Sequence, residues 1–177
     1  PFLELQGEVV LESSSCDTSE ADDDAVASAY TSSMGVNEAI VIVSAIKCDG
    51  EVVFGSITGS NRRMLKSGRH LEGSFTLEYI LNILVNPRSV PDSTSKFGEG
   101  ESSSEAFFQY IQQNLEDSFD NGKFAEDLAA EAERREAKVI ETATVNFEKT
   151  NIPRKWYISC RIRYVSKYMR LKLIRPS

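Results

Sequence analysis

The sequence predicts an α+β fold in which an antiparallel β-sheet is covered by a helical hairpin. An Asp-Gly pair at residues 49–50 separates two runs rich in β-branched residues, which is the signature of a β-hairpin. Two apolar stripes with helical spacing follow later, at about residues 104–119 and 123–137. The chain has 177 residues, of which 41% are hydrophobic, and this is enough to fill a substantial core.

The amino-terminal part begins with a strand and continues with an acidic loop. Residues 2–11 alternate imperfectly between apolar and polar side chains and predict the strand. Residues 13–24 are polar and acidic, and the loop that they form is expected to be solvated, because the ligand spacing of an EF-hand is absent. The last three acids suit the first turn of a short helix through residues 25–30, where they complement the helix dipole.

The hairpin and a third strand complete a β-rich lobe over residues 1–90. Residues 39–46 predict a buried strand and residues 52–58 the strand that returns from the Asp-Gly turn. Residues 75–85 alternate like a strand but also fit a helical stripe, so periodicity does not decide between them. Because consecutive strands tend to be neighbours, we expect a third strand of a meander.

A linker rich in serine, glycine and proline is expected at residues 91–103 and divides the chain into two lobes, unless the whole chain is one domain. The second lobe, residues 104–177, is predicted to have the order ααββ. The apolar stripe of the first helix is Phe107, Phe108, Ile111, Leu115 and Phe119, and that of the second is Phe124, Leu128, Ala129 and Ala132. Gly122 is suited to a left-handed cap between the two helices.

Alternation predicts two further strands at residues 139–147 and 156–165, with a turn at residues 151–153 between them. Residues 169–173 alternate again and predict a basic terminal strand or an extended arm. The stretch from Phe107 to Val145, with Asn121-Gly122-Lys123-Phe124 at its centre, resembles the second half of SEA-like, ferredoxin-like modules of secreted and cell-surface proteins. This resemblance covers under a quarter of the chain, transfers no functional residue and implies an extracellular structural or adhesive role.

Composition argues against catalysis and against a bound cofactor. His70 is the one histidine and lies in a polar, basic stretch, so it is expected to be an exposed residue and not a general base. No phosphate-binding, dinucleotide-binding or nucleophile-elbow motif is present, and the cysteines do not have the spacing of a metal site. Carboxylate pairs such as Glu126 and Asp127, or Asp22 and Asp24, are not placed by any motif. We therefore expect no enzyme, no cofactor and no metal.

The distribution of charge indicates how the protein could associate. Residues 1–46 contain nine acidic residues and no basic one, residues 154–177 contain eight basic residues and no acidic one, and the net charge is −7. Such segments can attract one another where subunits meet, or they can pair as adjacent strands of one molecule. The sequence therefore predicts a structural or assembly subunit that forms a homo-oligomer or polymer. The predicted contacts join Asp22, Asp23 and Asp24 to Arg161, Arg163, Arg170 and Lys172.

The alternative function is a polyanion-binding module for nucleic acid or acidic polysaccharide. It rests on the carboxy-terminal segment, where basic residues are interleaved with Trp156, Tyr157, Tyr164 and Tyr168. The acidic remainder of the chain opposes this alternative, because it would repel a long polyanion.

The expected location is extracellular or at the cell surface, with no membrane span, because the longest apolar runs are too short to cross a bilayer. This location assumes a cleaved signal peptide, which the first residue, Pro1, allows. Three cysteines permit one internal disulfide, and the sequence does not choose whether Cys16 or Cys160 would pair with Cys48.

Overall fold

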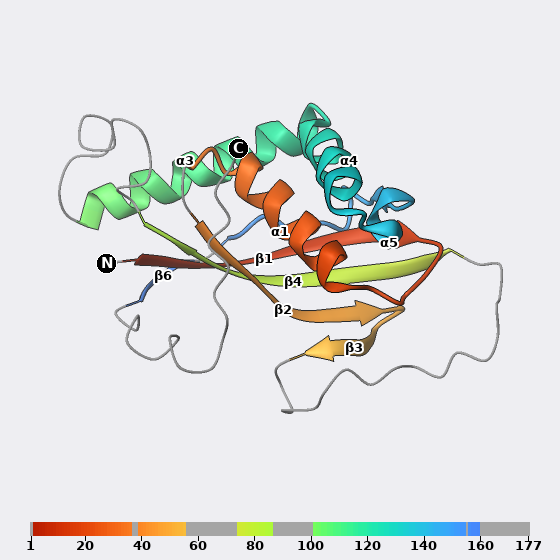
Figure 1. Ribbon diagram of the computed structural model, residues 1–177. Coiled ribbons are helices and arrows are strands. Elements are labelled where there is room, and N and C mark those ends of the chain that lie inside the picture. Colours follow the sequence, from red (N-terminus) through yellow and green to blue (C-terminus); the bar gives the residue numbers. More distant parts are fainter. Residues whose placement is uncertain (1, 37–38, 56–73, 87–100, 155, 160–177) are drawn as a thin grey trace.

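A computed structural model describes residues 2–36, 39–55, 74–86, 101–154 and 156–159, which form one antiparallel sheet with the helices on one side of it (Figure 1). The strands are β1 (Phe2–Ser13), β2 (Ala39–Cys48), β3 (Glu51–Gly55), β4 (Phe75–Val85), β5 (Thr144–Val145) and β6 (Trp156–Ser159). The helices are α1 (Glu20–Ser33), α3 (Glu101–Asp120), α4 (Lys123–Arg135) and α5 (Lys138–Glu141). The prediction of an α+β fold with an antiparallel sheet is confirmed.

The strand order is β3-β2-β4-β1-β5, and β6 pairs with β1 on the same edge as β5. Helix α1 joins β1 to β2, which lie on either side of β4. Along the chain, helices α3 and α4 follow β4 and precede β5 and β6. In the sheet, β1 lies between β4 and these two strands. This is the connectivity of two interlocked split β-α-β units.

The third strand of the sequence is in a different position from the one predicted. β4 is a strand, as expected, but it does not extend the hairpin as a meander would. It pairs with β2 and β1, so β2 lies between β3 and β4. The expected pairing of consecutive strands does not hold for β3 and β4, because both edges of β4 are occupied, one by β1 over eleven positions and the other by β2.

The Asp-Gly hairpin is confirmed. Asp49 and Gly50 have φ angles of 48° and 84°, and two consecutive positive φ values are what a tight two-residue turn of the primed type requires. The turn is also attached to β4, because the Asp49 amide donates to the Thr76 carbonyl and the Thr76 amide donates to Asp49 Oδ1, both at 2.9 Å.

The predicted helices are present, and their apolar stripes face the sheet. All five members of the α3 stripe are buried, as are Phe124, Leu128 and Ala132 on α4. Ala129 was assigned to the inner face but is exposed. Gly122 has a φ of 77° and forms the predicted left-handed junction between α3 and α4. Helix α1 is longer than predicted, since it begins with a capping box at Ser19 and continues to Ser33.

One hydrophobic core lies between the sheet and the helices. Alternate residues of β4 point into it: Leu77, Tyr79, Leu81, Ile83 and Val85. At its centre the rings of Tyr30, Phe119 and Phe124 pack edge to face, with 4.8 Å between the ring centroids of Phe119 and Phe124. Residues on both sides of the predicted 91–103 linker share this sheet and core, as expected if the described residues belong to one domain.

The strand predicted at residues 139–147 is wrong. Residues 138–141 form the short helix α5, and only Thr144–Val145 pair with β1. The β-branched residues of this stretch favour a strand, but the amides of Val139 and Ile140 are bound by the carboxylate of Asp22, which fixes the first turn of α5. Tertiary contact overrides the local preference.

The amino-terminal strand and the start of the carboxy-terminal segment pair within one chain. β6 runs antiparallel to β1 with Phe2 opposite Ser159 and Leu5 opposite Trp156. This matches the intramolecular alternative for residues 156–159. The rest of the strand predicted at residues 156–165, the segment at residues 169–173, His70 and most of the 91–103 linker lie outside the described residues.

Candidate interaction surface

Two of the three aspartates predicted as contact residues, Asp22 and Asp24, connect elements within the domain. Asp22 is only 1% exposed. Its Oδ2 accepts hydrogen bonds from the amide and the hydroxyl of Ser19 at 2.7 and 2.6 Å, and its Oδ1 accepts from the amides of Val139 and Ile140 at 3.0 and 3.2 Å. Asp22 therefore caps α1 and holds α5, and its predicted contact with another subunit is corrected because the carboxylate is buried.

Asp24 connects α1 to α4. Its carboxylate lies 3.3 Å from a guanidinium nitrogen of Arg135, which also binds Glu131 at 3.0 Å and the Ser28 hydroxyl at 2.8 Å. Asp23 is likewise engaged in interactions of its own. The four basic residues predicted as their partners, Arg161, Arg163, Arg170 and Lys172, lie outside the described residues.

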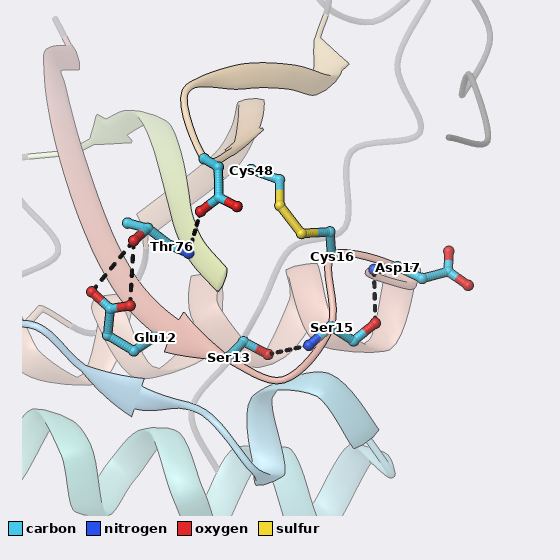
Figure 2. The surroundings of a disulfide bond; sticks show 8 residues. Glu12, Ser13, Ser15, Cys16, Asp17, Cys48 and Thr76 are labelled. Atoms are coloured by element: carbon cyan, nitrogen blue, oxygen red, sulfur yellow. Dashed lines mark hydrogen bonds between the residues drawn. A yellow bond between two sulfur atoms is a disulfide. The ribbon is translucent and has the colours of Figure 1, made fainter. Parts of the chain in front are cut away.

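A disulfide between Cys16 and Cys48 closes the end of the domain beside the hairpin turn (Figure 2). It joins the loop after β1 to the last residue of β2, and the two Cα atoms are 5.9 Å apart. Serine side chains shape the loop before it, because the Ser15 amide donates to the Ser13 hydroxyl and the Asp17 amide to the Ser15 hydroxyl. Of the two pairings that the sequence left open, the structure has Cys16 with Cys48.

One face of the sheet points away from the helices, and we call it the helix-free face (Figure 1). It carries acidic side chains. Glu4, Glu8 and Glu12 lie on it because residues four apart in a strand point to the same side. We call these three residues the acidic row. They lie opposite Leu84, Ile80 and Thr76 of β4, and these side chains share the helix-free face with them. The four-residue spacing of these glutamates is a signal in the sequence that predicts one row on one face of the strand. The charge of residues 1–46 taken as a whole does not distinguish this row from the aspartates.

Two members of the acidic row form no ion pair with any described residue. Glu12 lies 3.8 Å from the Lys149 amine and accepts from Asn146 at 3.1 Å. Glu8 accepts a hydrogen bond from the neutral amide group of Asn151, at 2.9 Å. Neither Glu8 nor Glu4 has an ion-pair partner among the residues described. The row therefore leaves negative charge to be neutralised.

Next to the acidic row, Lys47 and Glu78 form an ion pair across β2 and β4, with 3.0 Å between Nζ and Oε2. The pKa of Lys47 is raised, first by its hydrogen bond and charge interaction with Glu78 and then by the charge of Glu8. The charge of Lys47 is thus already paired with that of Glu78. It reduces the potential around Glu8 but does not pair with it.

A hollow of about 290 Å³ opens on the helix-free face. Its lining residues are Gln6, Gly7, Glu8, Lys47, Ile80 and Asn151. Beside it, Ile40 and Ile42 of β2 and Leu84 of β4 are only partly buried, so aliphatic and acidic side chains lie together on this face. Such a mixture is suited to a segment that carries both basic and apolar residues.

Within the part of the chain that the structure describes, no group of three or more histidine, cysteine or acidic residues is placed to hold a metal ion. The carboxylate pair Glu126 and Asp127 lies on the surface of α4, where Asp127 binds Lys123 at 2.9 Å. No described helix is long and apolar enough to cross a membrane.

Comparison with known proteins gives no assignment: no family model, no curated protein and no solved structure matches the chain. The resemblance of residues 107–145 to SEA-like modules therefore stays a prediction.

Proposed function

We propose that this domain is a non-catalytic structural or assembly subunit that self-associates through its acidic amino-terminal strand and its basic carboxy-terminal segment. The observation that carries the proposal is the acidic row on the helix-free face, where Glu4 and Glu8 lack an ion-pair partner among the described residues. Residues 160–177 contain six basic residues and no acidic one, so they carry the complementary charge.

The proposed location is extracellular or at the cell surface. The Cys16–Cys48 disulfide supports it, because disulfides persist in oxidising compartments and are rare in the cytosol. The proposal includes the resemblance to SEA-like modules, which implies the same location.

The alternative, a polyanion-binding module, uses the same basic segment but fits the described surface less well. An acidic row on the open face of the sheet would repel nucleic acid or an acidic polysaccharide laid across it. Nucleic acid and acidic polysaccharides usually bind to basic and aromatic residues, and Lys47, the basic residue described on this face, is already paired with Glu78.

Sedimentation velocity of the intact chain over a range of concentrations, at low and at high salt, tests the proposal. We expect association that weakens with salt, since the Debye length falls from about 30 Å at 0.01 M to about 8 Å at 0.15 M. A monomer at every concentration and ionic strength would overturn self-association. A monomer that is retained on heparin, with retention lost when residues 166–177 are removed, would favour the polyanion-binding alternative.

A further inference from the structure

We infer that the helix-free face, with the hollow at Glu8 as its centre, is the surface that receives residues 160–177 of a second copy of this chain. The inference rests on the proposed self-association and adds to it the surface where the contact is made. It also replaces the predicted contacts of Asp22 and Asp24, which bind α5 and α4 within the domain, with residues that point away from the helices.

The hollow fits a basic side chain better than an apolar one. Glu8, Lys47 and the amide groups of Gln6 and Asn151 line it. The charge of Lys47 is already paired with Glu78 at 3.0 Å, whereas Glu8 accepts a hydrogen bond from the neutral Asn151 on one oxygen, Oε2. The carboxylate keeps further acceptor positions, because an ionised carboxylate offers about four. A guanidinium or ammonium group inserted there would pair with Glu8, and the aliphatic part of its side chain would lie against Ile80.

The pattern of residues 160–177 matches the rest of the face. Basic residues alternate with apolar ones, as in Arg161-Ile162-Arg163 and Arg170-Leu171-Lys172. On the helix-free face the acidic row lies along β1, and partly exposed aliphatic side chains lie beside it on β2 and β4. An extended segment of this length reaches about 60 Å, whereas the span from Glu4 to Glu12 is about 27 Å, so the segment is long enough to follow the whole row.

The direction of β6 favours a second copy as the source of the segment. β6 runs toward the amino-terminal end of β1, where Ser159 lies opposite Phe2. The acidic row extends from that end in the opposite direction, toward Glu12. To cover its own row, the chain after Ser159 would have to leave the edge of the sheet and reverse over its face, whereas the segment of a neighbouring copy needs no reversal.

The test compares two double variants that remove the same charge. Glu4→Gln with Glu8→Gln removes the two charges of the acidic row that have no ion-pair partner among the described residues, and it keeps an oxygen that can accept from Asn151. Glu126→Gln with Glu133→Gln removes two exposed carboxylates from α4, on the helix side of the sheet, and serves as the control. At low salt we expect the dissociation constant of the face variant to rise roughly 3- to 30-fold and that of the control to remain within about twofold, since each exposed or half-buried pair contributes up to about 1 kcal/mol.

A mixing experiment identifies the second copy as the source. The face variant keeps its basic segment, and a chain with Arg170→Glu and Lys172→Glu keeps its acidic face. We expect each variant alone to associate weakly and an equimolar mixture to form a heterodimer, measured by sedimentation with one chain fluorescently labelled.

The outcomes separate this inference from the function on which it rests. If the wild type associates in a salt-dependent way and the face variant behaves like the control, the helix-free face is not the receptor, although self-association stands. If both variants weaken association but their mixture forms no heterodimer, the contact between segment and face in different copies is wrong. If the wild type is a monomer throughout, the proposed self-association and this inference fall together.

Discussion

Replacing Asp22 by asparagine is expected to lower the free energy of unfolding by about 2–5 kcal/mol. The side chain keeps its shape, but one carboxylate oxygen becomes an amide group that donates. Four donors converge on the carboxylate of Asp22, from Ser19 on one oxygen and from Val139 and Ile140 on the other. In either orientation of the asparagine side chain, its NH2 group faces the two donors that one carboxylate oxygen bound before. Each buried donor left without a partner costs about 1–3 kcal/mol.

Urea denaturation of the oxidised protein measures this loss, and a melting temperature lower by about 4–20 °C should accompany it at the usual 2–4 °C per kcal/mol. Asp17→Asn removes the same charge from an exposed position in the preceding loop and should change stability by less than about 0.5 kcal/mol. Hydrogen exchange locates the effect, because the amides of Val139 and Ile140 should exchange faster in the Asp22 variant. If that variant unfolds like the control and both amides keep their protection, Asp22 does not hold α5 in place.

Four further predictions concern the disulfide and the core. Replacing Cys16 and Cys48 together by serine should cost about 3.7 kcal/mol in denaturation, from the loop entropy of a 32-residue separation, and a loss below about 1 kcal/mol would contradict the pairing. Gly7→Ala should cost about 1–3 kcal/mol, because its Cβ would lie 2.5 Å from the hydroxyl oxygen of Tyr30; a neutral effect would show that this approach is not tight. Tyr30→Phe should be neutral or stabilising, since the buried hydroxyl has no hydrogen-bond partner among the described residues, and a clear loss would contradict this. Burial raises the pKa of Tyr30 and of Tyr79, so the folded state keeps both protons above pH 10 while the unfolded state loses them. Stability should therefore be full below about pH 10 and fall as pH rises further, less steeply in Tyr30→Phe, and an equal slope in that variant would refute the assignment.

The parts of the fold that the sequence predicted are those where a local pattern and the tertiary structure agree. The α3 stripe from Phe107 to Phe119 has helical spacing and is buried along its whole length. Asp49-Gly50 supplies the positive φ angles that a tight hairpin requires. Residues 75–85 were ambiguous by periodicity alone, and pairing with β1 and β2 on both sides makes them a strand.

The parts that the sequence did not predict depend on contacts between distant residues. The stretch after residue 138 has the composition of a strand, yet it begins as a helix because a carboxylate 117 residues away binds the Val139 amide. The position of β4 between β1 and β2 likewise follows from long-range pairing, on which hairpin chemistry has no influence. The choice of Cys16 as the partner of Cys48 needs the relative position of two strand ends, which spacing does not give.

The acidic amino-terminal segment contains two groups of carboxylates with different functions, and a charge count adds them together. Asp22 and Asp24 bind α5 and α4, so their charge is directed into the domain and contributes to stability. Glu4 and Glu8 lie on the opposite face of the sheet, and they form no ion pair with a described residue. The distinction follows from geometry, since every second residue of β1 points away from the helices, whereas Asp22 follows the Ser19 cap into the first turn of α1. The charge that can attract a second copy is therefore that of the strand and not that of the aspartate run, although the aspartate run is the more conspicuous of the two in the sequence.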